Sequence, residues 1–374
     1  MQKRRIQGVN NREDVVFGSN AIRLSGAEWI VVAVICLAAF FFAPSLWGQL
    51  GEIKSEPDYR LPYRLGGDYW LYSRLCRQAC SQYETVLVGD SVMWGHYAPA
   101  DGTLSHYLNE NAVKDEFANL GVDGFHPAAL WGLLKYYGRS ISDKEVILHL
   151  NPLWMSGRKQ DLQTEKEYRF QHQKLVPQFR PKIPCYKDSW SERVSVAIGR
   201  HVAFTGWTSH LRTAYFDNMD VPAWTMEHPY ENPLGAVTLE LPVADEDNPQ
   251  DDRSWTERSM TKQNFQWVGL ETSLQWKLFR KSVELLKARG NTVFVLVGPF
   301  NEHMFTGDSP GVYGRMKDGI ESWLRQSNIP YSMPEALPSE LYSDASHPLA
   351  EGYALLAKKL FENESFQSTI LGER

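Results

Sequence analysis

The run from Thr85 to Val88, which Gly89-Asp90-Ser91 follows directly, constrains the fold of this chain more than any other stretch. Four β-branched or apolar residues in succession indicate a buried strand. Ligands of open α/β sheets bind at the carboxyl ends of the strands, so such a strand would deliver Ser91 to a binding edge. The alternative is a structural turn, since Gly and Asp tolerate unusual backbone angles and Ser caps helices.

A second block, Ser343 to Pro348, has the sequence Ser-Asp-Ala-Ser-His-Pro. A serine hydroxyl is a weak nucleophile until a base takes its proton. His347 is a candidate for that base, and Asp344 for the carboxylate that orients the imidazole. The first block closes the first good strand after an apolar N-terminal segment, and the second opens the last helix of the domain. These positions favour catalysis over a simple turn and predict acyl transfer through Ser91.

Apolar strands and helical segments alternate through most of the chain, which implies a parallel sheet covered by helices on both faces. At 374 residues with 43% hydrophobic composition, the chain can bury a core for one large domain or two. We expect strands at 84–89, 116–120, 145–150 and 292–297, and helices near 101–111, 127–138, 264–289, 311–327 and 349–361. A long insertion at about 154–261 is expected to form a cap, with the acidic stretch 244–252 as a solvated loop.

These blocks resemble the SGNH, or GDSL, family of serine hydrolases and acyltransferases over residues 84–152 and 290–362. The resemblance implies a three-layer α/β/α sandwich with a parallel sheet. It implies a triad in which His347 accepts the Ser91 proton and Asp344 holds the imidazole in the correct tautomer. The absence of Gly-x-Ser-x-Gly at Ser91 argues against the α/β-hydrolase version of this triad.

The resemblance also implies an oxyanion hole. Its donors are the N–H of Ser91, the N–H of Gly124 and the side-chain amide of Asn151, with Gly121 as the alternative glycine. The glycines lie in the block Asn-Leu-Gly-Val-Asp-Gly at 119–124, which is similar to the second block of the family. The third block departs from the family pattern Gly-x-Asn-Asp, because it reads His-Leu-Asn-Pro at 149–152.

Four further residues are candidate substrate contacts. Trp94 and Trp154 each follow a catalytic strand by about one turn, and core packing is the alternative for both. Asn301 and His303 directly follow the strand at 292–297, where loop capping is the alternative. His96, His126 and His149 also lie near the predicted site, but the spacing of Cys and His residues fits no zinc site and no disulfide framework. We therefore expect no metal and no cofactor.

The segment Trp29 to Gly51 contains no charged residue and is long enough to cross a bilayer. Five basic residues precede it, Lys3, Arg4, Arg5, Arg12 and Arg23, which favours a cytoplasmic tail at 1–28 and a catalytic domain outside the cell membrane. A cleaved signal peptide is the alternative, but the long N-terminal lead and the lack of a clean cleavage site favour a permanent single-pass anchor. We expect a juxtamembrane arm at 52–83, the catalytic domain at 84–362 and a C-terminal tail at 363–374.

The formal net charge of −6 and the pI near 6.0 argue against nucleic acid as a partner. The leading interpretation is an extracytoplasmic serine esterase or acyltransferase for ester-linked acyl groups of an envelope glycan, lipid or polymer. An N-terminal anchor, an early serine and a late Asp-His pair resemble D-alanyl-lipoteichoic acid transfer proteins more than alginate O-acetylation proteins. That resemblance implies a membrane-bound O-acyltransferase as partner. The alternative is a non-catalytic envelope binding or assembly protein that retains the fold.

Overall fold

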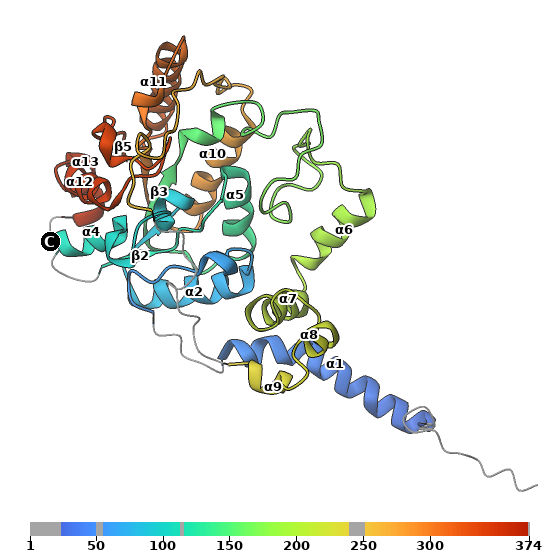
Figure 1. Cartoon of the computed structure of the whole chain (residues 1–374). Coiled ribbons are helices and arrows are strands. Elements are labelled where there is room, and N and C mark those ends of the chain that lie inside the picture. Colours follow the sequence, from blue (N-terminus) through green and yellow to red (C-terminus); the bar gives the residue numbers. More distant parts are fainter. Residues whose placement is uncertain (1–23, 50–54, 113–115, 239–250, 373–374) are drawn as a thin grey trace, which may run out of the picture.

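The computed structural model describes residues 24–49, 55–112, 116–238 and 251–372. Five parallel strands form one sheet in the order β2-β1-β3-β4-β5, with helices around it (Figure 1). The strands are β1 (Thr85–Val88), β2 (Phe117–Asn119), β3 (Glu145–Leu150), β4 (Thr292–Val297) and β5 (Tyr331–Ser332). The predicted α/β class with a parallel sheet is therefore confirmed. The expected cytoplasmic tail up to residue 23 and most of the acidic stretch 244–252 lie outside the described residues.

Helices connect the strands, as parallel pairing requires. Around the sheet lie α2 (Tyr69–Gln82), α3 (Ser91–Trp94), α4 (Leu104–Ala112), α5 (Pro127–Tyr136), α10 (Leu274–Lys287), α11 (Ser309–Gln326), α12 (Ala350–Phe361) and α13 (Glu364–Phe366). The expected insertion contains α6 (Trp190–Gly199), α7 (Ala203–Tyr215), α8 (Val221–Glu227) and α9 (Pro233–Ala236). Short 3-10 turns lie at Tyr63–Leu65, Ala100–Gly102, Pro152–Met155, Glu302–Met304 and Ser339–Leu341, and a π turn lies at Gln367–Leu371.

The surroundings of strand β1 explain why its sequence is apolar without interruption. Val86 and Val88 belong to an apolar cluster that includes buried residues of α2, α5 and α10. Leu87 belongs to a second cluster, with buried residues of α4 and α12. Successive side chains of a strand point to opposite faces, so β1 is buried on both sides. This burial holds its carboxyl end, and hence Ser91, at a fixed place.

Some boundaries differ from the sequence-based expectation. Helix α10 begins at Leu274 rather than near 264, because the Ser273 hydroxyl accepts the N–H of Trp276 at 3.0 Å and caps the helix there. The expected juxtamembrane arm contributes α2 and buried Leu61 and Leu65 to the first apolar cluster. The expected C-terminal tail includes α13, whose Phe366 is buried in the second cluster. Both segments are therefore parts of the folded domain.

Helix α1 (Gly26–Gln49) lies apart from the sheet, at the bottom of Figure 1. Among the described residues, it is the helix that is long and apolar enough to cross a membrane by length and composition. Helices α7, α8 and α9 lie beside its C-terminal half (Figure 1). Helix α7 of the insertion thus packs on the apolar helix, whereas the two ends of the insertion reach the carboxyl end of β1, where Trp154 bonds to Asp90 and Arg258 covers Tyr97.

The packing of α5 is testable at Gly132. A Cβ atom at this position would lie 2.0 Å from the backbone carbonyl oxygen of Leu175, which cannot rotate away. We expect Gly132→Ala to lower the free energy of unfolding by roughly 1–3 kcal/mol, as overpacking usually does. Gly314→Ala in α11 is the matched control, because a Cβ there meets nothing within 4 Å. It should raise stability by roughly 0.5–1 kcal/mol, and thermal unfolding of both variants measures the difference. Equal shifts in the two variants would contradict the packing.

Candidate active site

A one-turn helix presents Ser91 at the end of β1. Asp90 caps this helix, α3, through Oδ1, which accepts the N–H of Val92 at 3.1 Å. Gly95 ends it in the left-handed conformation, with φ of 88°. Ser91 is the first residue of α3, so its own N–H has no partner within the helix. The local sequence therefore leaves both the hydroxyl and the backbone N–H of Ser91 without a partner inside α3.

The structure brings Ser91, His347 and Asp344 together. His347 Nε2 lies 2.8 Å from Ser91 Oγ, and His347 Nδ1 lies 2.7 Å from Asp344 Oδ2. The other carboxylate oxygen of Asp344 accepts the backbone N–H groups of Ser346 at 2.9 Å and His347 at 3.0 Å. The Asp-Ala-Ser-His spacing thus folds into a tight turn that holds the carboxylate beside its own imidazole. This hydrogen-bonded series is the arrangement that activates a serine nucleophile.

The charges of this turn set the protonation of its two ionisable groups. Burial by itself would raise the pKa of Asp344, but the His347 imidazole and the two backbone N–H donors hold that pKa well below its usual range. Burial by itself would lower the pKa of His347, but the carboxylates of Asp344, Asp90 and Asp123 together outweigh burial and raise it. Asp344 therefore stays ionised, and His347 binds a proton more readily than a free histidine.

A second buried carboxylate, Asp90, holds the ends of β1 and β3 together. Its Oδ1 lies 3.0 Å from His149 Nδ1, and its Oδ2 accepts from Asn151 Nδ2 and Trp154 Nε1, both at 2.8 Å. His149 Nε2 lies 2.9 Å from the carbonyl oxygen of Gly298. Both nitrogens of His149 thus lie within hydrogen-bond distance of an oxygen atom, which fixes the orientation of the ring. Burial alone would raise the pKa of Asp90, yet His149 and the other donors lower it.

The candidate oxyanion donors have distinct surroundings. Asn151 is 2% exposed, and its bond to Asp90 fixes the direction of its amide. Gly124 has a φ of 71°, and a Cβ there would lie 1.9 Å from Oε1 of Gln171. Gly121 packs on α3 itself, because its Cβ would lie 2.4 Å from the backbone nitrogen of Trp94. Gly121 thus excludes a side chain by its contact with the backbone, whereas Gly124 needs the left-handed conformation that favours glycine.

Residues that the sequence analysis did not assign to the site also surround His347. Its ring lies 5.0 Å from the ring of His96, whose Nδ1 is 2.7 Å from Asp123 Oδ1. The edge of Tyr97 meets His347 at 5.6 Å, and the guanidinium of Arg258 covers Tyr97 at 4.5 Å. No sequence motif includes Tyr97 or Arg258. Arg258 belongs to the insertion, which matches no motif. The three histidines singled out by sequence have separate partners: Asp123 for His96, Asp90 for His149, and Gln171 and Gln275 for His126.

The structure distributes the four expected substrate contacts differently. Trp94 is 1% exposed and donates its Nε1 hydrogen to the carbonyl of Leu61 at 2.7 Å, so its surroundings are those of the core-packing alternative. Asn301 is fully buried and donates to the carbonyl of Asp344 at 3.0 Å, which supports the catalytic turn instead. His303 lies 2.9 Å from the carbonyl of Leu337 and caps a loop. Trp154 alone of the four stays beside the site, through its bond to Asp90.

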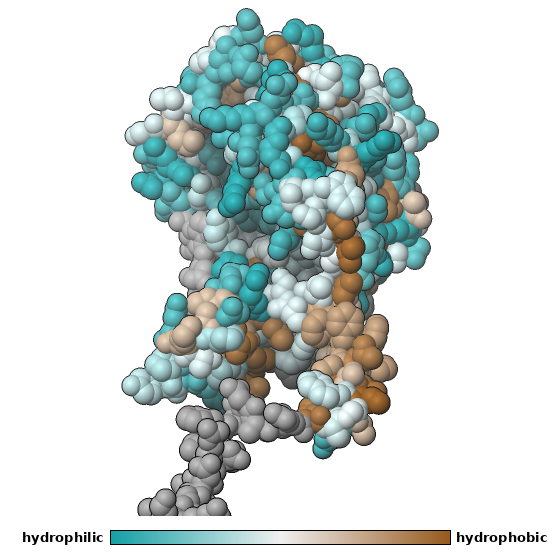
Figure 2. All heavy atoms as spheres, turned by 90° about the vertical axis from the view of Figure 1, so that its right-hand side faces the viewer, coloured by the Kyte–Doolittle hydropathy of each residue, from teal (hydrophilic) through white to brown (hydrophobic). Residues whose placement is uncertain are grey.

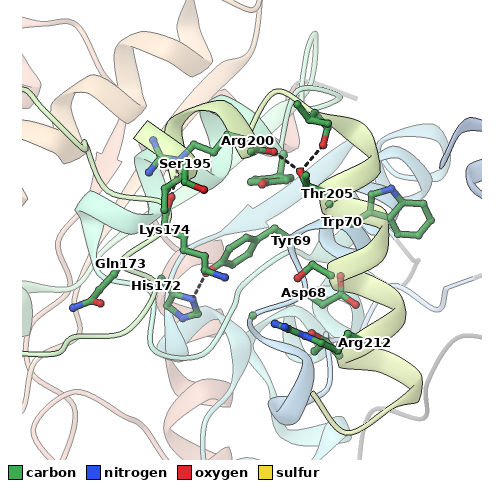
Figure 3. Close-up of a pocket in the computed structure, with 18 of the residues that line it drawn as sticks. Asp68, Tyr69, Trp70, His172, Gln173, Lys174, Ser195, Arg200, Thr205 and Arg212 are labelled. Carbon is green, nitrogen blue, oxygen red and sulfur yellow. Dashed lines mark hydrogen bonds between the residues drawn. The ribbon is translucent and has the colours of Figure 1, made fainter. Parts of the chain in front are cut away.

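A large cavity lies away from Ser91. It has a volume of about 970 Å³ and is enclosed by residues of α2, α6 and α7 and by residues 172–174, with Tyr69 and Arg200 pointing into it (Figure 3). His172 joins this cavity to the loop of Gly124, because its ring nitrogens lie 3.1 Å from the Tyr69 hydroxyl and 3.4 Å from the Asp123 carbonyl. Burial lowers the pKa of His172 to about 3, so this ring is neutral near pH 7.

A scan of protein-family models finds no match to the chain, and a search of curated proteins finds none either. The function is therefore inferred from the geometry of this site.

The raised pKa of His347 predicts the pH dependence of Ser91. A neutral imidazole is needed to accept the Ser91 proton, and the Asp344 carboxylate keeps His347 protonated to higher pH. The rate of fluorophosphonate labelling of Ser91 should thus rise with pH, with a midpoint above that of an unperturbed histidine, about 6.5. Asp344→Asn removes the charge and should both slow labelling and move the midpoint to lower pH. Labelling rates across the neutral pH range test this, and an unmoved midpoint in Asp344→Asn would refute the assigned role of Asp344.

Proposed function

We propose that this protein is a membrane-anchored serine esterase or O-acyltransferase that acts on ester-linked acyl groups of a cell-envelope glycan, lipid or related polymer. One observation carries the proposal: Asp344, His347 and Ser91 form an unbroken hydrogen-bonded series at the end of β1. A Ser-His-Asp series of this geometry serves nucleophilic acyl transfer on several unrelated folds.

The first half of the reaction forms an acyl-serine. His347 Nε2 takes the Ser91 proton while Oγ attacks the ester carbonyl, and the carbonyl electrons move onto oxygen as an oxyanion. The N–H groups of Ser91 and Gly124 and the second amide hydrogen of Asn151 are the proposed donors to this oxyanion. Loss of one such donor typically costs about 3 kcal/mol of transition-state stabilisation. When the intermediate collapses, the ester C–O bond breaks and His347 gives its proton to the leaving alcohol.

The second half returns the enzyme to its starting state. The hydroxyl of water or of an acceptor attacks the acyl-Ser91 carbonyl while His347 accepts its proton. The Ser91–acyl bond then breaks, and the proton passes from His347 to Ser91 Oγ. Water as the nucleophile gives hydrolysis and another alcohol gives transfer, so the same residues serve both reactions.

The altered third block is compatible with this chemistry. His149 occupies the place of the usual glycine, and Gly89 leaves room for it, since a Cβ at Gly89 would lie 2.7 Å from His149 Cβ. The imidazole then pairs with Asp90, which also holds the Asn151 amide. In this proposal the sheet and its flanking helices are an SGNH-like three-layer sandwich with a substituted polar cluster behind the nucleophile.

The proposed location follows from α1 and the residues before it. We infer that α1 crosses the cell membrane once, with the basic N-terminal residues on the cytoplasmic side and the catalytic domain outside. A membrane-bound O-acyltransferase is the proposed partner, because it would deliver the acyl group close to the bilayer.

The second candidate is a non-catalytic binding or assembly protein of the envelope that retains this fold. The observation that favours it is the third block, where the family glycine and aspartate are replaced by His149 and Pro152. Reactivity of Ser91 separates the two candidates, because binding alone needs no activated hydroxyl.

The proposed activity is tested by hydrolysis of p-nitrophenyl acetate and longer p-nitrophenyl esters by the purified full chain. Ser91→Ala and His347→Ala should each lower kcat/KM roughly a thousandfold or more. The control Ser81→Ala removes an exposed hydroxyl at the far end of α2 and should leave activity unchanged. The midpoint of thermal unfolding of Ser91→Ala should stay within a few degrees of the parent. Full activity in Ser91→Ala would exclude this mechanism, and an inert Ser91 that also resists fluorophosphonate would favour the binding protein.

A further inference from the structure

Helix α7 of the insertion packs directly on the apolar helix α1. The ring of Phe204 stacks on the ring of Phe40 with centroids 4.8 Å apart. Trp207, one turn further along α7, meets Trp47 at 6.0 Å. Figure 1 shows α7, α8 and α9 gathered around the C-terminal half of α1. The insertion is therefore attached to the segment that we propose to cross the membrane.

The position of Phe40 along α1 sets the depth of this contact. The helix has 24 residues, a length of about 36 Å at the usual rise per residue. The hydrocarbon layer is about 30 Å thick, and Phe40 lies about 14 Å before the end of the helix. In a spanning α1, Phe40 and hence Phe204 lie at hydrocarbon depth, whereas Trp47 lies near the interface where Trp is enriched.

Helices α6, α8 and α9, which flank α7 in the chain, expose large apolar side chains. Helices α6 and α9 bury none of their residues. Met226 at the end of α8 is 78% exposed, and Leu234 in α9 is 84% exposed. The other large exposed apolar residues on α6 and around α8 are Trp190, Ile198, Val221 and Tyr230. Figure 2 shows brown atoms gathered in the lower part of this face, at the height of α1 and α7–α9, below a largely teal upper part.

Water is a poor surrounding for these short helices. Helix α8 has seven residues and α9 has four, and helices below about 12 residues are marginal in water without tertiary packing. Each exposed side chain of the Leu or Met class also forgoes roughly 1.5–3 kcal/mol of burial free energy. A bilayer that surrounds α1 covers the adjoining apolar side chains without any further partner.

An adjoining face of α7 contacts the folded domain. His210 Nδ1 lies 2.6 Å from Asp68 Oδ2 in a buried pair at the start of α2. The ring of Trp70 stacks on His210 at 4.5 Å. Helix α7 also forms one wall of the 970 Å³ cavity, where Thr205 and Arg212 lie on its side (Figure 3). One face of α7 thus contacts α1 and another face contacts the folded domain.

We propose that α7, α8 and α9 form an in-plane membrane contact, with Phe204, Met226 and Leu234 seated in the outer leaflet beside α1. The proposal rests on the membrane-spanning role proposed for α1, and it assigns the insertion a function that catalysis does not require. The occupant of this surface is lipid, because its exposed apolar side chains adjoin the apolar helix α1 through the packing of α7 on α1. The contact holds the catalytic domain in one orientation above the bilayer.

Site-specific depth measurements on the full chain in phosphatidylcholine vesicles test this contact. Met226→Cys and Leu234→Cys are each labelled with the fluorophore NBD, in a background where Cys36 and Cys80, the two cysteines that are not buried, are serine. Vesicles that contain acyl-chain nitroxide lipids should quench both probes several-fold more than a probe at Gln326→Cys. Gln326 is exposed at the end of α11, far from α1 in Figure 1.

A probe at Leu37→Cys tests separately whether α1 crosses the membrane, because Leu37 is an exposed residue of α1 itself. Quenching at 37, 226 and 234 but not at 326 supports the in-plane contact. Quenching at 37 alone overturns the contact and leaves the anchor intact. Absence of quenching at 37 overturns both.

Discussion

The buried carboxylate of Asp90 is the interaction on which the rest of the site depends. It caps the helix that begins with Ser91, and it accepts hydrogen bonds from His149, Asn151 and Trp154 on and after the neighbouring strand β3. Buried charges are costly unless they are paired and fully hydrogen-bonded, and Asp90 meets both conditions. Its neighbours are fixed in direction as a result, which is the preorganisation that acyl transfer needs.

Two Asp–His pairs lie near the end of β1, and their imidazoles face different second partners. In the pair of Asp344 and His347, the second ring nitrogen faces the hydroxyl of Ser91, a group that can lose its proton. In the pair of Asp90 and His149, the second ring nitrogen faces the carbonyl of Gly298, which has no proton to give. The identity of the atom beyond the imidazole, rather than the pairing itself, thus separates the proposed base His347 from His149.

Sequence reasoning recovers the parts of this structure that local patterns determine. Strand β4 spans Thr292–Val297 as expected, because the five residues after Thr292 alternate between two buried faces. The contact of Ser91 with His347 follows from motif chemistry, although 256 residues separate them. Local pattern left two environments open for Trp94, because an aromatic residue one turn after a strand can point to the core as well as to a ligand, and in the structure it is buried. The partners of Tyr97 and His149 depend on how distant segments meet, which no local pattern encodes.

The insertion shows the same limit on a larger scale. Its length and its place after a strand suggested a cap, but neither property says which surface such a cap would cover. Phe204, in a segment with no recognisable motif, stacks on Phe40 of the apolar helix α1. Only their juxtaposition relates the insertion to a membrane, and it is absent from the linear sequence.

The central claim is that Ser91 carries the acyl group during the reaction. Brief incubation of the full chain with p-nitrophenyl acetate, acid quenching, digestion and mass spectrometry tests it directly. We expect one acetyl group on the peptide that contains Ser91, formed as fast as the first p-nitrophenol is released, and no such adduct in His347→Ala. Release of p-nitrophenol with no acetyl group on Ser91, or with acetyl groups only on lysines, would contradict the account.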